Sequence, residues 1–173
     1  MEKIILNNKI EMPMIGFGTY QMPAKTTEKC VCEALKIGYR KIDTAQCYFN
    51  EREVGLAIKN SKIPREKIFV TTKLWGGRGY EDTLQSIEKS LKSLGTYIDL
   101  LLINDPSGNF NEIYRAMEQK YFEGKLKSIG VANFFEENFK KLMRTVEIIP
   151  AVNQIETHIF RQQTNMNKFL KNF

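Results

Sequence analysis

A tyrosine, a lysine and an aspartate that could together move a proton lie near the ends of apolar segments of this chain. Asp43 and Tyr48 are five residues apart in DTAQCY and follow the apolar run 39–42. Lys73 closes the next such run, 68–72. A free tyrosine has a pKa of about 10 and is a poor acid or base at neutral pH. A nearby ammonium lowers that pKa and a carboxylate keeps the ammonium charged, so the set could donate a proton to a substrate.

Each of the three residues also has an alternative interpretation. Tyr48 alone could be a half-buried loop aromatic, and Asp43 alone could be a turn or helix-capping residue. Lys73 is harder to explain structurally, because a buried ammonium needs a partner. A lysine on a strand can also form a Schiff base, as in an aldolase, but the spacing of Asp43 and Tyr48 argues against that chemistry. The order of the three residues therefore favours a proton-donating site.

Strands and helices alternate along the chain and would position these residues. A hairpin is expected at 3–10, because two asparagines interrupt an apolar stretch there. Strands are predicted at 13–18, 40–43, 67–73, 98–104, 127–133 and 150–156. Helices are predicted at 26–37, 50–59, 80–94, 112–123, 136–146 and 161–172. Asn50 and Glu53 have the spacing of a capping box at the start of the second helix.

This alternation is typical of parallel βαβ units. The repeat of about 30 residues is that of an α/β protein of the (β/α)₈ TIM-barrel type, and about six units fit. We therefore expect a single domain, residues 1–173, that forms an incomplete barrel with an N-terminal hairpin. A doubly wound open sheet is the alternative. Polar residues at the ends of predicted strands favour the barrel, because there they converge on one mouth: Asp43, Lys73, Asn104, Asn133 and Glu156.

The composition is that of an ordered globular chain. Hydrophobic residues make up 42% and charged residues 27%, so disorder is not expected. The net charge of +6 is attributed to lysine-rich helix faces, with attraction of a phosphate-bearing cofactor as the alternative. The sequence has no dense basic run with interleaved aromatic residues, so a nucleic-acid partner is not expected.

The cysteines and the apolar runs bear on compartment and membrane contact. Three cysteines without metal-like spacing predict a reduced, cytoplasmic chain with no metal site. The N-terminus is too polar for a signal peptide. The run 100–103 is far shorter than a membrane span, so no membrane partner is expected.

The sequence DTAQCYFNEREVG, with a later TTKLW, resembles the aldo-keto reductases from Gly16 to about Lys171. The resemblance implies an oxidoreductase that reduces aldehyde and ketone carbonyls to alcohols with NADPH, or alternatively with NADH. It makes Tyr48 the proton donor. Lys73 would lower the pKa of Tyr48, and Asp43 would pair with Lys73.

Further site residues are implied by the same resemblance. GFGTY at 16–20, GVANF at 130–134 and AVNQIETH at 151–158 match strand ends of the family. The resemblance assigns the cofactor to Gly18, Thr19, Asp43, Asn133 and Gln154. It assigns the small carbonyl substrate to Tyr20, Cys47, Phe49 and Trp75, although Cys47 and Phe49 could equally be plain loop residues. His158, the single histidine, matches a structural position.

Two departures from the family support an alternative reading. Asn104, in YIDLLLINDPSG, stands where the family has a catalytic histidine, and its amide can donate a hydrogen bond but cannot carry charge. The chain is also expected to be truncated, because it ends after the sixth unit, before the segments that clamp the cofactor phosphates. The alternative is a catalytically impaired relative that acts as a scaffold or binding protein.

An incomplete barrel also predicts exposed edges. The first and sixth strands would lack one neighbour each, and unpaired strands promote self-association. Interior side chains would lose their cover as well, and we expect these to include Ile15, Ile42, Val70, Leu102, Val131 and Val152.

Overall fold

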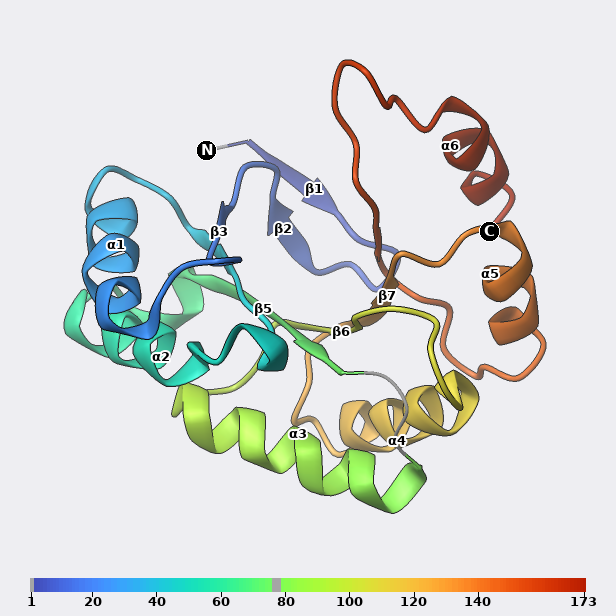
Figure 1. Cartoon of the computed structure of the whole chain (residues 1–173), viewed down its shortest axis with the longest axis horizontal. Coiled ribbons are helices and arrows are strands. Elements are labelled where there is room, and N and C mark those ends of the chain that lie inside the picture. Colours follow the sequence, from blue (N-terminus) through green and yellow to red (C-terminus); the bar gives the residue numbers. More distant parts are fainter. Residues whose placement is uncertain (1, 76–78) are drawn as a thin grey trace.

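A curled sheet of six parallel strands forms the centre of the computed structural model, which describes residues 2–75 and 79–173. The strand order is β3-β4-β5-β6-β7-β8, so every strand lies beside its neighbours in sequence. A doubly wound sheet reverses its order at a switch point, whereas a barrel does not. The expected incomplete barrel is therefore confirmed (Figure 1). The strands are β3 (Phe17–Gly18), β4 (Lys41–Asp43), β5 (Phe69–Leu74), β6 (Leu100–Ile103), β7 (Ile129–Ala132) and β8 (Asn153–Gln154).

Helices alternate with the strands and surround the outer face of the sheet (Figure 1). The α-helices are α1 (Ala24–Lys36), α2 (Glu51–Asn60), α3 (Tyr80–Leu94), α4 (Phe110–Phe122), α5 (Glu136–Met143) and α6 (Thr164–Leu170). There are also two 3₁₀ turns. The first, η1 (Gln46–Tyr48), follows β4, and the second, η2 (Arg65–Lys67), precedes β5. The prediction for α3 is confirmed at both ends, because Gly95 ends the helix in the left-handed conformation with φ of 64°. None of the helices described is long and apolar enough to cross a membrane.

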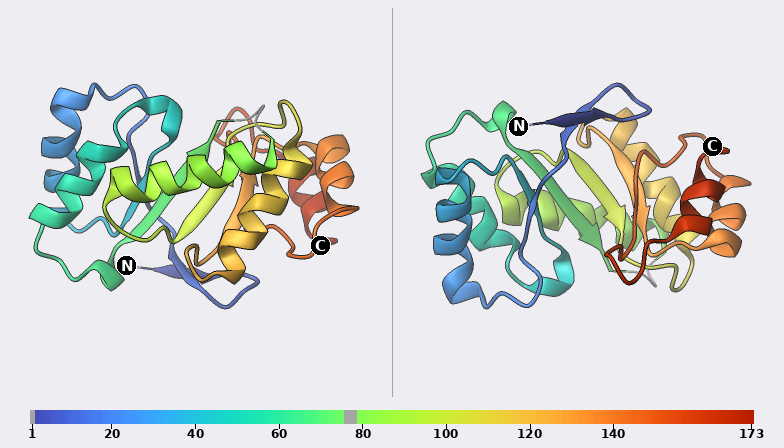
Figure 2. Two further views of the ribbon diagram at one scale, coloured as in Figure 1. Left: turned by 90° about the horizontal axis from the view of Figure 1, so that it is seen from below. Right: turned by 90° about the horizontal axis from the view of Figure 1, so that it is seen from above.

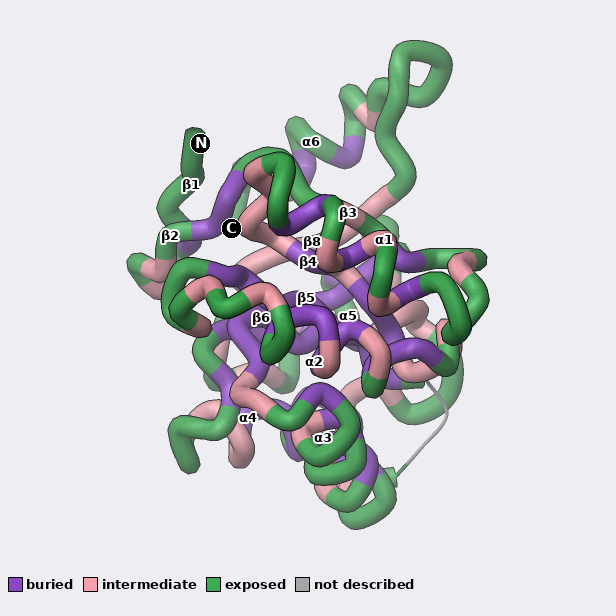
Figure 3. Tube along the Cα trace, turned by 90° about the vertical axis from the view of Figure 1, so that its left-hand side faces the viewer, coloured by how far each residue is buried: buried purple, intermediate pink, exposed green. Residues whose placement is uncertain are grey.

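The outer face of the sheet packs against the helices. Ile42, Val70 and Val131 are fully buried in this outer cluster, together with residues of every helix from α1 to α6. The expectation that these three line the barrel interior is wrong. Side chains alternate between the two faces of a strand, so the neighbours of the inward-facing Asp43 must point outward. Figure 3 shows buried positions concentrated on the strands and on the helix faces that cover them.

The inner face forms a second, smaller cluster. Leu102 belongs to it, and Val152 packs against it, as expected. Phe69, Leu100 and Ala132 complete its strand portion. The inner face is therefore apolar near the beginning of the strands and carries its polar residues near their carboxyl ends.

An N-terminal hairpin covers the amino ends of the strands (Figure 2). Its strands β1 (Lys3–Ile5) and β2 (Glu11–Pro13) pair antiparallel, so the predicted hairpin is confirmed with a later second strand. Leu6 and Met12 join the inner cluster. Asn8 Nδ2 donates to the Lys127 carbonyl, 2.9 Å away, just before β7. The strand expected at 13–18 is mostly wrong, since 14–16 form an exposed link and only Phe17–Gly18 pair.

Candidate active site

Asp43 and Lys73 meet where β4 and β5 end inside the barrel. Their side chains form a short ion pair and are 15% and 3% exposed. Lys73 Nζ also donates to the Thr44 carbonyl at 3.2 Å. Removing either charge would leave the other nearly buried and unpaired, which is strongly unfavourable. The contact between Asp43 and Lys73 that the family resemblance implies is therefore present.

Tyr48 ends the η1 turn that follows β4, and this turn directs its hydroxyl to Lys73. The Lys73 Nζ lies 3.3 Å from Tyr48 Oη and 5.1 Å from the centre of the ring. Burial raises the pKa of Tyr48, and the charge and hydrogen bond of Lys73 lower it only in part. The expected lowering by Lys73 is present, but the net direction is upward. Tyr48 therefore keeps its proton at neutral pH.

Two amide side chains, one just after β7 and one on β8, approach the same mouth. Gln154 Nε2 donates to Asp43 Oδ2 at 2.8 Å, so Asp43 bridges Lys73 and Gln154. Asn133 adopts a left-handed backbone with φ of 61°, and its Nδ2 donates to the Asn104 carbonyl at 2.9 Å. Both amides thus use their nitrogen within the protein. Their side-chain oxygens have no partner among the residues that the structure describes.

Asn104 follows β6 at the mouth. Its backbone N–H donates to the Leu74 carbonyl at 2.9 Å, which extends the pairing of β5 and β6 by one residue. Its side-chain Nδ2 lies 3.3 Å from Asp105 Oδ2. One of the two amide hydrogens of Asn104 is therefore engaged by the neighbouring carboxylate, and the other has no partner among the described residues.

The remaining expected residues surround the mouth with different degrees of exposure. Gly18 is exposed, whereas Thr19 is fully buried and its hydroxyl lies 3.2 Å from Asn50 Oδ1. Tyr20 is 68% exposed, and its ring centre is 5.1 Å from that of Tyr48.

The other three expected substrate residues lie in the η1 turn or close to it. Phe49 and Trp75 are exposed, and Cys47 is half-buried. Burial raises the pKa of the Cys47 thiol, so it is a neutral thiol at this position. Together with Tyr20, these residues would give a substrate a largely apolar surrounding.

Comparison with known proteins agrees with this geometry. Residues 14–173 match the Aldo/keto reductase family. The chain belongs to this family. It is 40% identical over 174 residues to a glyoxal reductase of Bacillus subtilis, covering 98% of this chain and 63% of that protein. The chain thus spans less than two thirds of that relative's length.

Solved aldo-keto reductase structures have the same fold. An aldo/keto reductase from Brucella melitensis is 43% identical, with a TM-score of 0.95 over 99% of this chain and 69% of that one. An aldo-keto reductase of Bombyx mori, solved in complex with NADP, is 30% identical with a TM-score of 0.91 over 99% of this chain and 63% of that one.

In this member of the family, Asn50 has contacts that the sequence pattern did not predict. The expected capping box with Glu53 is wrong, because Asn50 makes no side-chain cap. Its Oδ1 instead accepts from the hydroxyl groups of Thr44 at 2.8 Å and Thr19 at 3.2 Å. Its Nδ2 donates to the carbonyls of Thr19 and Met22. Asn50 therefore ties the loop after β3 to the loop after β4, which contains Tyr48.

Gln46 is a second residue that the sequence analysis missed. Its Nε2 donates to Ser86 Oγ at 2.8 Å and to Ser90 Oγ at 2.9 Å. Its Oε1 accepts from the Trp75 backbone N–H at 3.4 Å. Gln46 thus fixes the η1 turn, which carries Tyr48, to α3 and to the end of β5. The signal available in the sequence was two serines one turn apart on the apolar face of α3.

Lys41 lies on the same face of β4 as Asp43 and was also missed. A Cβ atom at Gly16 would lie 3.0 Å from the Lys41 side chain, so the link before β3 covers this lysine closely. Burial lowers the pKa of Lys41, while the charge of Asp43 opposes this effect. The period of two along a strand would have placed Lys41 beside the site.

Proposed function

We propose that the protein reduces the carbonyl group of aldehydes or ketones to an alcohol with NADPH, and that this chain supplies the proton. The observation that carries the proposal is the continuous contact from Tyr48 through Lys73 to Asp43 at the mouth of the barrel. Family membership and the glyoxal reductase among the relatives support the reaction class.

The proposed proton transfer follows from the contacts of Tyr48. The raised pKa keeps the phenol protonated, so it can donate to a carbonyl oxygen that gains negative charge. The ammonium of Lys73, 3.3 Å away, then stabilises the phenolate that forms. Asp43 and the Thr44 carbonyl hold Lys73 in place. No step requires Lys73 to lose a proton.

The mouth fits the nicotinamide end of a cofactor. The side-chain oxygens of Asn133 and Gln154 can accept hydrogen bonds from a carboxamide, because their nitrogens already have protein partners. When bound, a reduced nicotinamide supplies the hydride that no side chain can provide. We assign Gly18 and the backbone around Thr19 to the same end of the cofactor. The NADP complex of the Bombyx mori relative supports this cofactor class, and the preference for NADPH rests on family resemblance.

The substrate carbonyl would lie between Tyr48 and Asn104. We propose that Asn104 Nδ2 turns from Asp105 and donates to the carbonyl oxygen. Tyr20, Cys47, Phe49 and Trp75 would then contact the rest of the substrate.

Tyr48→Phe tests the proposed function, because it removes one hydroxyl and leaves the ring. We expect the rate of aldehyde reduction, followed by NADPH absorbance, to fall by about 10²-fold or more, as for loss of a general acid. The circular dichroism spectrum should not change. Tyr121→Phe removes a phenol on α4 and serves as the matched control. Unchanged turnover of Tyr48→Phe would remove Tyr48 from the reaction.

A non-catalytic binding protein is the second candidate function, and the hydrogen bond between Asn104 and Asp105 is the observation that bears on it. If this candidate is correct, binding of NADPH would quench the fluorescence of Trp75, but the chain would show no turnover. Asn104→His would then restore reduction, by about 10-fold or more over background, because a positioned donor returns. Turnover by the unaltered chain would exclude this candidate.

The Schiff-base alternative for Lys73 is not supported by its contacts. Lys73 Nζ donates to Asp43, Thr44 and Tyr48, which accounts for all three ammonium protons. An attacking amine would need a free electron pair instead. Borohydride trapping of a substrate on Lys73, detected by mass spectrometry, would contradict this conclusion.

A further inference from the structure

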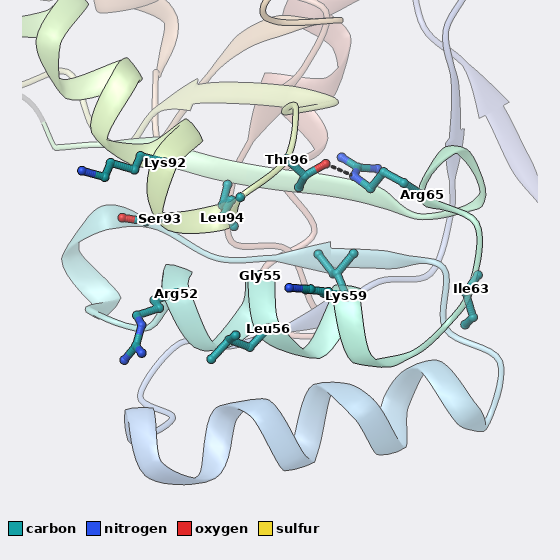
Figure 4. A pocket seen from close by; sticks show the side chains of 12 residues that line it. Arg52, Gly55, Leu56, Lys59, Ile63, Arg65, Lys92, Ser93, Leu94 and Thr96 are labelled. Atoms are coloured by element: carbon teal, nitrogen blue, oxygen red, sulfur yellow. Dashed lines mark hydrogen bonds between the residues drawn. The ribbon is translucent and has the colours of Figure 1, made fainter.

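A groove of about 740 Å³ lies on the outside of the barrel between α2 and the end of α3 (Figure 4). Its volume is within the range of about 300–1,000 Å³ that is usual for sites of small ligands. None of the residues proposed for carbonyl reduction lines it. Its lining comprises Arg52, Gly55, Leu56, Ile58, Lys59, Ile63, Arg65, Lys92, Ser93, Leu94, Gly95 and Thr96.

The base of the groove is a close contact between two helices. A Cβ atom at Gly55 would lie 2.3 Å from the Leu94 carbonyl oxygen, so only glycine allows α2 to approach the end of α3 this closely. Beside that contact, Leu56 and Ile63 are only partly buried. The groove therefore offers an apolar floor that is open to solvent.

The charged residues of the lining are all positive: Arg52, Lys59, Arg65 and Lys92. Arg65 already has partners, because its Nη2 lies 2.6 Å from Asp99 Oδ2 and its Nε donates to Thr96 Oγ1 at 2.8 Å. Lys59 and Lys92 form no ion pair with any described residue. The carboxylate nearest Arg52 is that of Glu53, at 3.9 Å. The positive charges of Arg52, Lys59 and Lys92 are therefore little neutralised by carboxylates of the described residues.

Helix ends explain only part of this charge. Lys59 and Lys92 lie in the last turns of α2 and α3, where cations interact favourably with the helix dipole. Arg52 lies in the first turn of α2, where the dipole disfavours a cation. Thr96 Oγ1 accepts from Arg65, so its own hydrogen remains available to donate. The groove thus combines cations, a hydroxyl donor and apolar surface.

We propose that this groove binds an organic phosphate monoester with an apolar body. The phosphate, with a charge of about −1.5 to −2 at neutral pH, would lie among Arg52, Lys59 and Lys92. The apolar body would lie on Leu56 and Ile63. The site is independent of the proposed carbonyl reduction, so either can fail without the other.

Naphthyl phosphate is the probe, with naphthol and inorganic phosphate as its two halves. We expect calorimetry to show naphthyl phosphate binding about tenfold or more tightly than either half, because both parts of the groove are filled. Binding should weaken as salt rises from about 0.01 to 0.15 M, since exposed charges are screened over that range. The backbone amide NMR signals that change on binding should include those of Gly55, Gly95 and Thr96.

Charge reversal locates the site. Lys59→Glu with Lys92→Glu should weaken binding by about tenfold or more, because two attractions become repulsions. Lys29→Glu with Lys89→Glu makes the same change in net charge on α1 and α3 outside the groove, and should leave affinity within about twofold. Ser93→Trp fills the groove without changing charge and should also abolish binding. Equal affinity in the two double variants, binding unaffected by Ser93→Trp, or shifts confined to the barrel mouth would overturn the proposal.

Discussion

The hydroxyl of Tyr48 experiences two opposing influences on its pKa. Burial raises the pKa, and the Lys73 ammonium lowers it. Lys73→Met removes the lowering influence, so the pKa of Tyr48 should rise further. A difference ultraviolet titration against Tyr48→Phe measures the midpoint directly. An unchanged or lower midpoint would show that the two groups do not interact as described.

The same variant should impair reduction. Without the ammonium, the phenolate that forms after proton transfer is unstabilised, and kcat should fall by about 10²-fold or more.

In the unaltered protein, the rate of reduction should be constant through neutral pH. It should fall only as the pH passes the raised pKa of Tyr48, where the donor loses its proton.

The three proton-transfer residues could be predicted because Asp43 and Lys73 lie at the ends of strands and Tyr48 lies in the turn just after one. Parallel strands bring their ends to one mouth. The interior residues were predicted less well. Ile42 and Val70 were placed inside although the adjacent Asp43 already fixed the inward face of β4. Asn50 could not be identified, because its partners after β3, Thr19 and Met22, are remote in sequence and the local pattern suggested a cap.

The η1 turn is an element whose position is fixed in part by the side chain of Gln46. Gln46 joins this turn to α3, and Tyr48 is two residues further on. Gln46→Ala should therefore lower kcat more than it raises KM, by about tenfold, because small displacements of a reacting group are costly. It should also shift the pKa of Tyr48, which a loss of stability alone would not do. Gln85→Ala, on the exposed side of α3, is the control, and an unshifted pKa would contradict a positioning role.

Helix α2 carries a buried carboxyl group with consequences for stability. Glu51 is 9% exposed, and its Oε1 accepts from Thr72 Oγ1 at 2.7 Å. Burial raises the pKa of Glu51, although hydrogen bonds from Thr72 and Ser90 oppose this. Its contribution to stability is therefore fully present below the unfolded pKa, about 4.3, and is lost as the pH rises through the folded pKa.

Glu51→Gln tests this assignment, because the amide keeps an acceptor for Thr72 and never ionises. The melting temperature of the variant relative to the unaltered protein should rise between about pH 4 and pH 7, with each kcal/mol worth about 2–4 °C. Glu66→Gln, at an exposed position, should show no such trend. A difference in melting temperature that is independent of pH would refute the buried-carboxylate interpretation.

The sheet as a whole has two edges, β3 and β8, each paired on one side only. We propose that the 173-residue chain self-associates through these edges, because unpaired strands readily add another. Exposed Ile15 and Ile159 lie near the two edges in sequence and would favour the same outcome. Sedimentation should show oligomers, or the melt should be low and weakly cooperative. A clean monomer with a sharp melt above about 60 °C would contradict this expectation.

The topology of the molecule was easier to predict than the lengths of its strands. The strand order followed from the regular βαβ repeat. The sixth strand was expected at 150–156, but β8 comprises only Asn153–Gln154, with backbone hydrogen bonds to β7 extending back to Ala151. A ladder needs a partner as well as suitable residues, and β8 has one neighbour, β7. Apolar runs therefore overstate strands at the edges of a sheet.

The hairpin at the amino ends of the strands has a consequence for the time course of folding. Asn7 Nδ2 lies 3.4 Å from the Pro150 carbonyl, a contact between residues 143 positions apart. Contacts of such sequence separation form late, because a long loop must close first. The hairpin thus cannot complete this contact until the entry to β8 has been synthesised. Until then the inner cluster that buries Leu6 and Met12 lacks Ala151 and Val152, so part of its apolar surface has no cover from this chain.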